Sequence, residues 1–196
     1  MLKKICLFIA SSLLFVPTTF AQSAPSASSR VLSIHAGGEL STFNPDWGCV
    51  SASVFSCWDR HLTGVAVVVD ANHVVLSKLG VEAEARWLHW GGPGSGLIQS
   101  NYLLGPRYRL FRFDKLSVYG KGMVGESWMT IPGGYGSRRY FTLVPGPTAE
   151  YGLTKRLTVR LDYEYQIWPQ FSGISTLPNH RLTPNGLSFG ATYKIF

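Results

Sequence analysis

The stretch "TVRLDYEYQIW" (residues 158–168) alternates strictly between two kinds of side chain. Polar or charged residues occupy the even positions from Thr158 to Gln166, and apolar or aromatic residues occupy the odd positions from Val159 to Ile167. Because successive side chains of a β-strand point to opposite faces, this period of two predicts a strand with one polar and one apolar face. The fold depends on which face meets water.

The same alternation recurs in seven other segments, so we expect eight strands. These segments are residues 31–42, 62–72, 79–90, 100–111, 116–125, 141–151 and 186–196. The connections alternate between long and short, with about 18 residues after the first strand, about 13 after the fifth and about 17 before the last. This order is typical of an up-and-down meander, and the 21 glycines and 11 prolines also favour an all-β chain.

The amino terminus has the layout of a secretory signal peptide. Residues 1–21 begin with Lys3 and Lys4, continue with an apolar run and end on Ala21. A membrane-anchoring helix is the alternative, but the run is too short for a full span and Pro17 interrupts it. We expect cleavage after Ala21, a flexible leader over residues 22–30 and a single domain over residues 31–196.

Two cysteines, Cys49 and Cys57, would remain after this cleavage. In an exported chain an even pair of cysteines favours a disulfide, because the compartment is oxidising. Two free thiols are the alternative. No metal site is expected, since two cysteines lack partners at ligand spacing, and no cofactor is expected either.

The polar faces of the predicted strands carry charges of both signs. An eight-stranded barrel has an interior just wide enough for side chains, so charges inside it must pair. An ordinary solvated face is the alternative. The predicted lumen charge network consists of Glu39, Glu82, Glu84, Arg86, Arg107, Arg109, Lys121, Glu150, Arg160, Asp162, Glu164 and Lys194.

The apolar faces are about ten residues long, which is enough for a tilted strand to cross an outer membrane. Aromatic residues near their ends suit interfacial girdles; these residues are Trp87, Tyr102, Tyr151, Tyr163 and Tyr193. Open sheet edges are not tolerated in hydrocarbon, so the sheet must close. The predicted fold is therefore a closed eight-stranded antiparallel transmembrane β-barrel, with charges inside and apolar side chains facing lipid.

The chain resembles the small bacterial outer-membrane β-barrels, such as the transmembrane domain of outer membrane protein A. The resemblance rests on "STFNPDW", "GVEAEARWL", "NYLLGPRYRLFRF", "DYEYQIW" and the terminal "GLSFGATYKIF". It implies location in the outer membrane and assembly by the barrel-assembly machinery, which reads a terminal aromatic residue, here Phe196. The pattern usually has a second aromatic residue two positions earlier, where this chain has Lys194.

The expected function is that of a non-enzymatic integral outer-membrane protein with a filled lumen and long extracellular loops for structural or binding roles. One alternative is a lipid-modifying enzyme that uses Ser33, His35 and Glu39, which share the polar face of the first strand. The other alternative is a soluble periplasmic barrel of the lipocalin type, which has its apolar face inside.

Lipopolysaccharide is expected as a partner besides the assembly machinery and ordinary lipids. Arg138 and Arg139, placed in the third loop, could hold the phosphates of lipopolysaccharide, with solvated loop charge as the alternative. The sequence points to no nucleic-acid partner. It favours a monomer but leaves the oligomeric state open.

Overall fold

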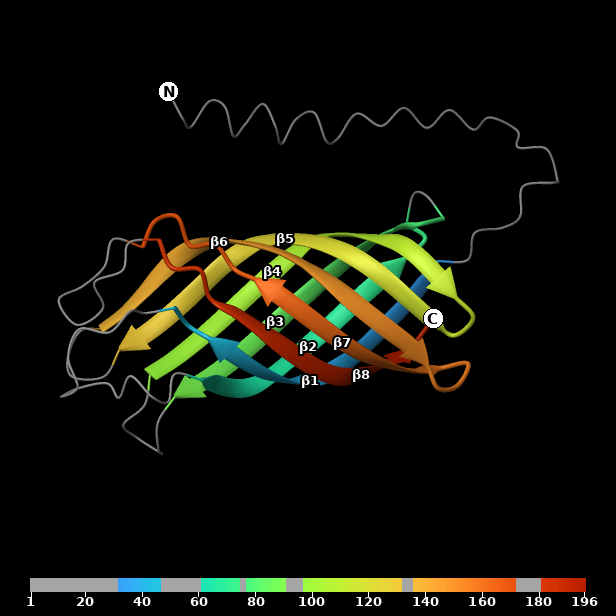
Figure 1. Ribbon diagram of the computed structural model, residues 1–196, viewed down its shortest axis with the longest axis horizontal. Helices are drawn as coiled ribbons and strands as arrows, with labels where there is room; N and C mark the ends of the chain where they lie inside the picture. Colours follow the sequence, from blue (N-terminus) through green and yellow to red (C-terminus); the bar gives the residue numbers. More distant parts are fainter. Residues whose placement is uncertain (1–31, 47–60, 75–76, 91–96, 132–135, 172–180) are drawn as a thin grey trace, which may run out of the picture.

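The computed structural model describes residues 32–46, 61–74, 77–90, 97–131, 136–171 and 181–196. These residues form eight antiparallel strands that pair in sequence order, and β1 also pairs with β8, so the sheet closes into a barrel (Figure 1). The strands are β1 (Ser33–Asn44), β2 (Leu62–Asn72), β3 (Leu79–Trp90), β4 (Leu97–Phe113), β5 (Leu116–Ile131), β6 (Gly136–Gly152), β7 (Leu157–Tyr165) and β8 (Asn185–Lys194). The predicted eight-stranded up-and-down barrel is confirmed.

Within the part of the chain that the structure describes, there is no helix with the length and apolar character needed to cross a membrane.

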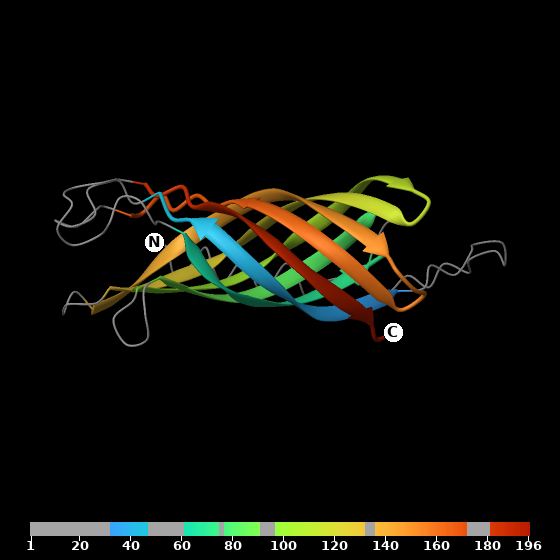
Figure 2. The same ribbon diagram turned by 60° about the horizontal axis from the view of Figure 1, so that its bottom comes forward.

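The two ends of the barrel differ (Figures 1 and 2). One end, which we call the turn end, carries the connections 73–78, 114–115 and 153–156 together with the start of β1 and the last residue, Phe196. The other end, the loop end, carries the connections 45–61, 91–96, 132–135 and 166–184. The longest connections thus lie at one end, as the sequence predicts.

The connection after β5 is shorter than the roughly 13 residues that the sequence predicts. It spans only residues 132–135, because β5 continues to Ile131 and β6 already begins at Gly136. The expected pattern breaks down here, since the polar side chain of Glu126 faces outward and the apolar side chain of Met129 faces inward. Arg138 and Arg139 therefore lie in β6 rather than in a loop.

The closing pair of strands shows that Lys194 does not disturb the register of β8. Lys194 pairs with His35 of β1, while Leu187, Phe189 and Tyr193 all point outward. Beyond β8, the backbone N–H of Ile34 donates to the Phe196 carbonyl at 3.0 Å, and Ile195 N–H donates back to Ile34 at 2.8 Å. The side chain of Phe196 is 66% exposed.

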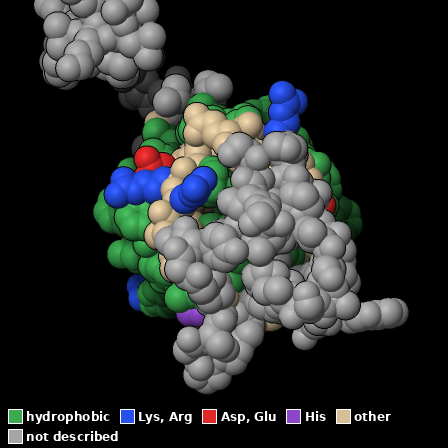
Figure 3. Space-filling view, turned by 90° about the vertical axis from the view of Figure 1, so that its left-hand side faces the viewer, with side chains coloured by type: hydrophobic (Ala, Val, Ile, Leu, Met, Phe, Trp, Pro, Cys, Tyr) green, Lys and Arg blue, Asp and Glu red, His purple; other side chains and the backbone are tan. Residues whose placement is uncertain are grey.

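The outer wall is apolar. Large apolar side chains point outward from every strand, for example Leu40, Val67, Leu104, Val124, Leu143, Leu161 and Phe189. Exposed aromatic side chains gather toward the strand ends, with Tyr108, Phe113, Tyr151 and Tyr193 near the turn end and Trp128, Tyr163 and Tyr165 near the loop end. Figure 3, which faces the loop end, shows apolar side chains around the wall and Lys and Arg side chains at the rim.

This arrangement is the inverse of a soluble barrel, in which apolar side chains fill the interior. The outer wall of the barrel is apolar along the strands, and buried charged side chains fill the lumen. The soluble lipocalin-like alternative requires the opposite orientation, so the structure excludes it.

Candidate functional site

The most unusual part of the molecule is the lumen, where eleven charged side chains from seven strands lie close together. We call this group the charged section. It comprises Glu39, Asp70, Glu82, Glu84, Arg86, Arg107, Lys121, Glu150, Arg160, Asp162 and Glu164, all of which are buried.

Lys121 of β5 lies at the centre of the charged section. Its Nζ lies 2.7 Å from Asp162 Oδ1 and 2.8 Å from Glu164 Oε1, both on β7. It also lies 3.0 Å from Glu82 Oε1 and 3.7 Å from Glu84 Oε2, both on β3. One ammonium group therefore contacts carboxylates on strands from different sides of the barrel.

Arg160 of β7 joins further strands. Its Nε lies 2.6 Å from Glu39 Oε1 on β1 and 2.8 Å from Asp162 Oδ2. Its Nη2 donates to Glu82 Oε1 at 3.0 Å. Because each of these pairs is buried, loss of one partner would leave an uncompensated charge, which makes the pairs mutually dependent.

Two arginines bound the charged section along the barrel axis. Arg86 contacts Glu84 and donates to Glu164 Oε2 at 2.6 Å, and its guanidinium lies 4.4 Å from the centre of the Phe43 ring. Arg107 donates to Glu82 Oε2 at 3.0 Å and to Glu150, and it lies 3.8 Å from the centre of the Tyr119 ring. Both arginines thus combine ion pairs with stacking on an aromatic ring.

Glycines make room for these long side chains. Across the strand pairs, Gly80 lies opposite Arg107, Gly146 opposite Lys121 and Gly190 opposite both Glu39 and Arg160. A Cβ atom added at Gly190 would lie 2.7 Å from Cγ of Glu39, and one added at Gly80 would lie 3.1 Å from Cγ of Arg107. The alternation of small and large residues lets a narrow barrel hold so many charges.

Acidic side chains outnumber basic ones in the charged section. It contains seven carboxylates and four cations. Ten of its members are among the twelve positions that the sequence assigned to the lumen network. The other two predicted cations, Arg109 and Lys194, are only partly buried and lie below the charged section at the turn end. Three more carboxyl groups than cations are therefore packed in this part of the lumen.

Asp70 is the member that the sequence assignment missed, although the alternation in 62–72 already placed it on the polar face. Its Oδ1 lies 3.0 Å from Nδ1 of His35 and accepts a hydrogen bond of 2.7 Å from Asn72 Nδ2. Its Oδ2 lies 3.4 Å from Nη1 of Arg107. Asp70 thus connects the charged section to the residues at the turn end.

The three residues named for the alternative lipid-modifying enzyme do not come together. Glu39 lies six residues from Ser33 along β1, about 20 Å at the rise of a strand, and it pairs with Arg160. The carboxylate beside His35 is that of Asp70 instead. Among the described residues, no hydrogen bond joins Ser33 to His35, so the serine lacks the contact to a base that this alternative requires.

Above the charged section lies a layer of uncharged polar side chains, formed by Gln99, Asn101, Ser127, Thr142 and Gln166. Asn101 Nδ2 donates to Ser127 Oγ at 2.6 Å and to Gln166 Oε1 at 3.3 Å. Thr142 Oγ1 donates to Ser127 Oγ at 2.6 Å. Hydrogen bonds between neutral groups thus continue the filling of the tube toward the loop end.

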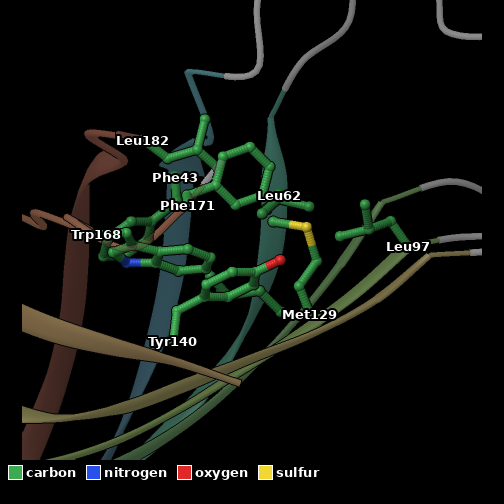
Figure 4. Packing of buried hydrophobic residues seen from close by; sticks show 9 residues of the cluster. Phe43, Leu62, Leu97, Met129, Tyr140, Trp168, Phe171 and Leu182 are labelled. Atoms are coloured by element: carbon green, nitrogen blue, oxygen red, sulfur yellow. The ribbon is translucent and has the colours of Figure 1, made fainter. Parts of the chain in front are cut away.

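At the loop end, nine apolar and aromatic side chains close the tube (Figure 4). This apolar cap consists of Phe43, Leu62, Leu88, Leu97, Met129, Tyr140, Trp168, Phe171 and Leu182. Trp168 stacks on Tyr140 with ring centres 5.6 Å apart, and its Nε1–H donates to Gln166 Oε1 at 3.1 Å. The sequence does carry a signal for the cap. At the inward-facing positions the residues are polar in the middle of a strand and become apolar near its loop end, as at Leu88 and Met129.

The remaining predicted site residues lie elsewhere. Arg139 points outward from β6, and its guanidinium lies 4.4 Å from the centre of the Trp128 ring. Arg138, its neighbour, is also exposed. Cys49 and Cys57 lie outside the described residues, as do the predicted signal peptide and leader, so the disulfide and the cleavage stay predictions.

No family model matches the sequence, and no curated protein matches it. Solved structures do match. Neisserial surface protein A is 11% identical, with a TM-score of 0.55 over 84% of this chain and 97% of that one. The outer membrane protein OprG from Pseudomonas aeruginosa is 13% identical, with a TM-score of 0.55 over 85% and 97%. The N-terminal barrel domain of Pseudomonas aeruginosa OprF is 11% identical, with a TM-score of 0.51 over 83% and 97%.

At these identities the similarity concerns the fold. The remaining argument comes from this chain itself, whose apolar wall and buried charges suit lipid outside and packed side chains inside. The chain thus has the fold of the small outer-membrane β-barrels, and its inverted surface places it in the cell outer membrane.

Proposed function

We propose that the protein is a non-enzymatic outer-membrane scaffold that presents its loop end to the exterior and does not act as a diffusion pore. The observation that carries this proposal is the filling of the lumen. Going from the turn end to the loop end, the tube contains the charged section, then the layer of neutral polar side chains, then the apolar cap. A solute would have to displace all three to pass.

The orientation follows from the two ends of the barrel. Outer-membrane barrels have short turns in the periplasm and longer connections outside. The turn end, which carries Phe196 and the start of β1, therefore faces the periplasm. The two longest connections, 45–61 and 166–184, then lie on the outside, where a rigid barrel can hold them as a binding surface.

Electrical recording tests the closed lumen. The folded protein, purified in a non-ionic detergent, is inserted into planar bilayers, and insertion is checked by the heat-modifiable gel mobility of the same sample. We expect no stepwise current. Protein kept unfolded in urea is the control for currents caused by detergent or contaminants. Regular current steps from the folded sample alone would overturn the proposal.

Lipopolysaccharide is the partner that the outer wall suits best at the loop end. Trp87, Tyr102 and Trp128 pack edge to face, with ring centres 6.3 Å and 6.0 Å apart, and Arg139 lies over Trp128. Arg139 thus combines an aromatic anchor at the interface with a guanidinium that can bind phosphate in a bidentate way. We propose contact through Arg139 rather than through a loop.

The test uses the neighbouring arginine as its control. Arg139→Ser and Arg138→Ser remove the same charge from adjacent positions of β6. Lipopolysaccharide retained after detergent extraction is measured for both variants and for the parent protein. We expect retention to fall for Arg139→Ser only. Equal retention in all three proteins would remove the idea.

For assembly, we propose that the barrel-assembly machinery reads Phe196. Its carbonyl accepts the hydrogen bond from Ile34, while its side chain is free to contact another protein. Phe113 is a matched control, because it is also an exposed phenylalanine at the turn end. We expect Phe196→Ala to lower the folded fraction in the outer membrane several-fold and Phe113→Ala to leave it unchanged. Equal fractions for both variants would contradict the proposal.

A further inference from the structure

The barrel is not filled at its turn end. Below the charged section lies a cavity of about 610 Å³, which we call the vestibule. Its lining includes five cationic side chains, namely Arg109, Arg112, Lys115, Lys155 and Lys194. The carboxylates in the lining are Asp114 and Glu150, and Glu150 is bound by Arg107. The vestibule is therefore positively charged, whereas the charged section above it has an excess of carboxylates.

A β-bulge in β4 turns a second arginine into the vestibule. The register between β4 and β5 shifts between Arg109 and Phe111, so that Leu110 and Phe111 both point outward. Arg112, three residues after Arg109, consequently lines the vestibule. In a regular strand, Arg109 and Arg112 would lie on opposite faces, and one of them would face lipid. The bulge thus directs both guanidinium groups to the same side.

These cations keep most of their hydrogen-bonding capacity. Arg109 donates from Nη2 to the Ser77 carbonyl at 3.0 Å, and Arg112 donates from Nε to the Asp114 carbonyl at 3.3 Å. Among the described residues, neither arginine forms an ion pair, and the same holds for Lys194. A guanidinium carries five N–H groups, so each arginine can still hold two oxygens of an oxyanion.

We propose that the vestibule binds a phosphate-bearing ligand from the periplasmic side. Guanidinium groups favour the planar, bidentate recognition of phosphate oxygens, and two of them line this cavity. The hydroxyl groups of Ser33, Ser117 and Thr158 add neutral donors to the lining. The carboxylates of the charged section repel an anion and stop it at the floor of the cavity. Assigning this end to the periplasm rests on the proposed function.

Two sources could supply this chemistry. A soluble organic phosphate could enter from the periplasm, or the headgroup of an anionic phospholipid in the periplasmic leaflet could reach the rim of the vestibule. The rim lies beside exposed apolar side chains such as Phe113 and Phe196, which are expected at the membrane interface. The ligand atoms recognised would be the same in both cases.

Calorimetric titration of the full chain tests the shared chemistry. Inorganic pyrophosphate is titrated into folded protein in a non-ionic detergent at low ionic strength, where charge contacts are least screened. We expect saturable binding and at least a tenfold loss of affinity in the double variant Arg109→Gln/Arg112→Gln. The control, Arg138→Gln/Arg139→Gln, removes the same charge at the loop end and should bind like the parent protein. Absence of binding, or equal losses in both variants, would overturn the proposal.

Native mass spectrometry separates the two sources. The same proteins are incubated with micelles containing phosphatidylglycerol or phosphatidylcholine. A lipid adduct that pyrophosphate displaces and that Arg109→Gln/Arg112→Gln loses assigns the site to a headgroup. Pyrophosphate binding with no adduct assigns it to a soluble phosphate. Heat-modifiable gel mobility verifies that each variant is folded. If the double variant does not fold, Lys194→Gln replaces it, and we expect the same loss of pyrophosphate affinity and of the lipid adduct. The conductance experiment is independent, so this proposal can fail while the proposed function stands.

Discussion

The charged section and the apolar cap fill the same tube with opposite chemistry. In the charged section, every cation contacts carboxylates from more than one strand, as Lys121 does with β3 and β7. In the cap, side chains such as Leu62 and Leu97 pack without directional bonds, and the connection before β8 contributes Trp168, Phe171 and Leu182. Both regions exclude water, but they depend on sequence in different ways.

The difference concerns specificity. Hydrophobic packing tolerates changes of shape when the volume is kept, whereas a buried charge needs its own partner at the right distance. Arg160, for example, contacts Glu39 on β1 and Glu82 on β3, so it relates strands that are not neighbours in the sheet. We infer that the charged section fixes the register of the barrel and that the cap mainly seals it. The predictions below test this contrast.

Removal of Lys121 should have the largest effect. Lys121→Met keeps much of the side-chain volume but leaves four buried carboxylates without their shared cation. Breaking a buried ion pair by removing one partner costs about 3–5 kcal/mol, and we expect a loss of that size in the free energy of unfolding. Urea unfolding in phospholipid vesicles measures it.

The control for this variant is Lys194→Met. Lys194 also faces inward, but it lies in the vestibule and forms no ion pair among the described residues. We expect a change within about 0.5 kcal/mol, as for other sites without such contacts. Equal losses for the two lysine variants would show that the charged section does not act through its pairs.

In the apolar cap, truncation should cost less than loss of the central cation but more than truncation of an exposed leucine. Leu88 is fully buried in the cap, and Leu→Ala changes at such sites cost about 2–5 kcal/mol. We expect Leu88→Ala to fall toward the lower part of this range, because the cap lies at the end of the barrel and not in its middle. Leu153→Ala, in an exposed turn, serves as the control. The same urea titration measures both leucine variants. Equal losses of stability for Leu88→Ala and Leu153→Ala would contradict a tightly packed cap.

Much of the fold could be predicted from the sequence because one face of each strand is apolar over most of its length. In 81–87 and 158–165 the alternation is unbroken, so both the strand and its orientation follow from it. The inward positions of Glu82, Arg86, Arg160 and Asp162 follow from the same alternation, and ten predicted network residues are buried together.

The parts that could not be predicted lie where the surroundings of the strands change. Near the loop end the inner face of the barrel becomes apolar and the outer face becomes more polar, so Glu126 and Met129 reverse the expected pattern. For this reason the predicted strand stops at residue 125, although β5 continues to Ile131. The bulge after Arg109 is equally hidden, because one extra residue changes the faces without any turn residue to mark it. Pairing partners such as Asp70 and His35 depend on register, which alternation alone does not give.

The glycines opposite the long charged residues provide a further test of how tightly the charged section is packed, with an expected loss of stability smaller than that for Leu88→Ala. A methyl group at Gly190 would lie 2.1 Å from the Gly38 carbonyl oxygen and close to Glu39, so Gly190→Ala must move the backbone of β1 or displace the ion pair with Arg160. Overpacking of this kind costs about 1–3 kcal/mol. Gly122→Ala is the matched control, since nothing lies within 4 Å of its added methyl group. If urea titration shows the two glycine variants to be equal, the lumen is less tightly filled than these contacts indicate.

The smallest effect should come from removing one of the surplus carboxylates. Glu84→Gln keeps an oxygen near Arg86, while Arg86 and Lys121 both retain Glu164. Because seven carboxyl groups share four cations and both neighbouring cations keep Glu164, we expect the free energy of unfolding to change by less than about 1 kcal/mol or to rise. Glu164→Gln is the comparison, since it takes away a carboxylate that contacts both Arg86 and Lys121 at hydrogen-bonding distance, and it should be clearly destabilising. If Glu84→Gln is as damaging as Glu164→Gln, then the carboxylates of the charged section are not in excess, and each is needed at its own position.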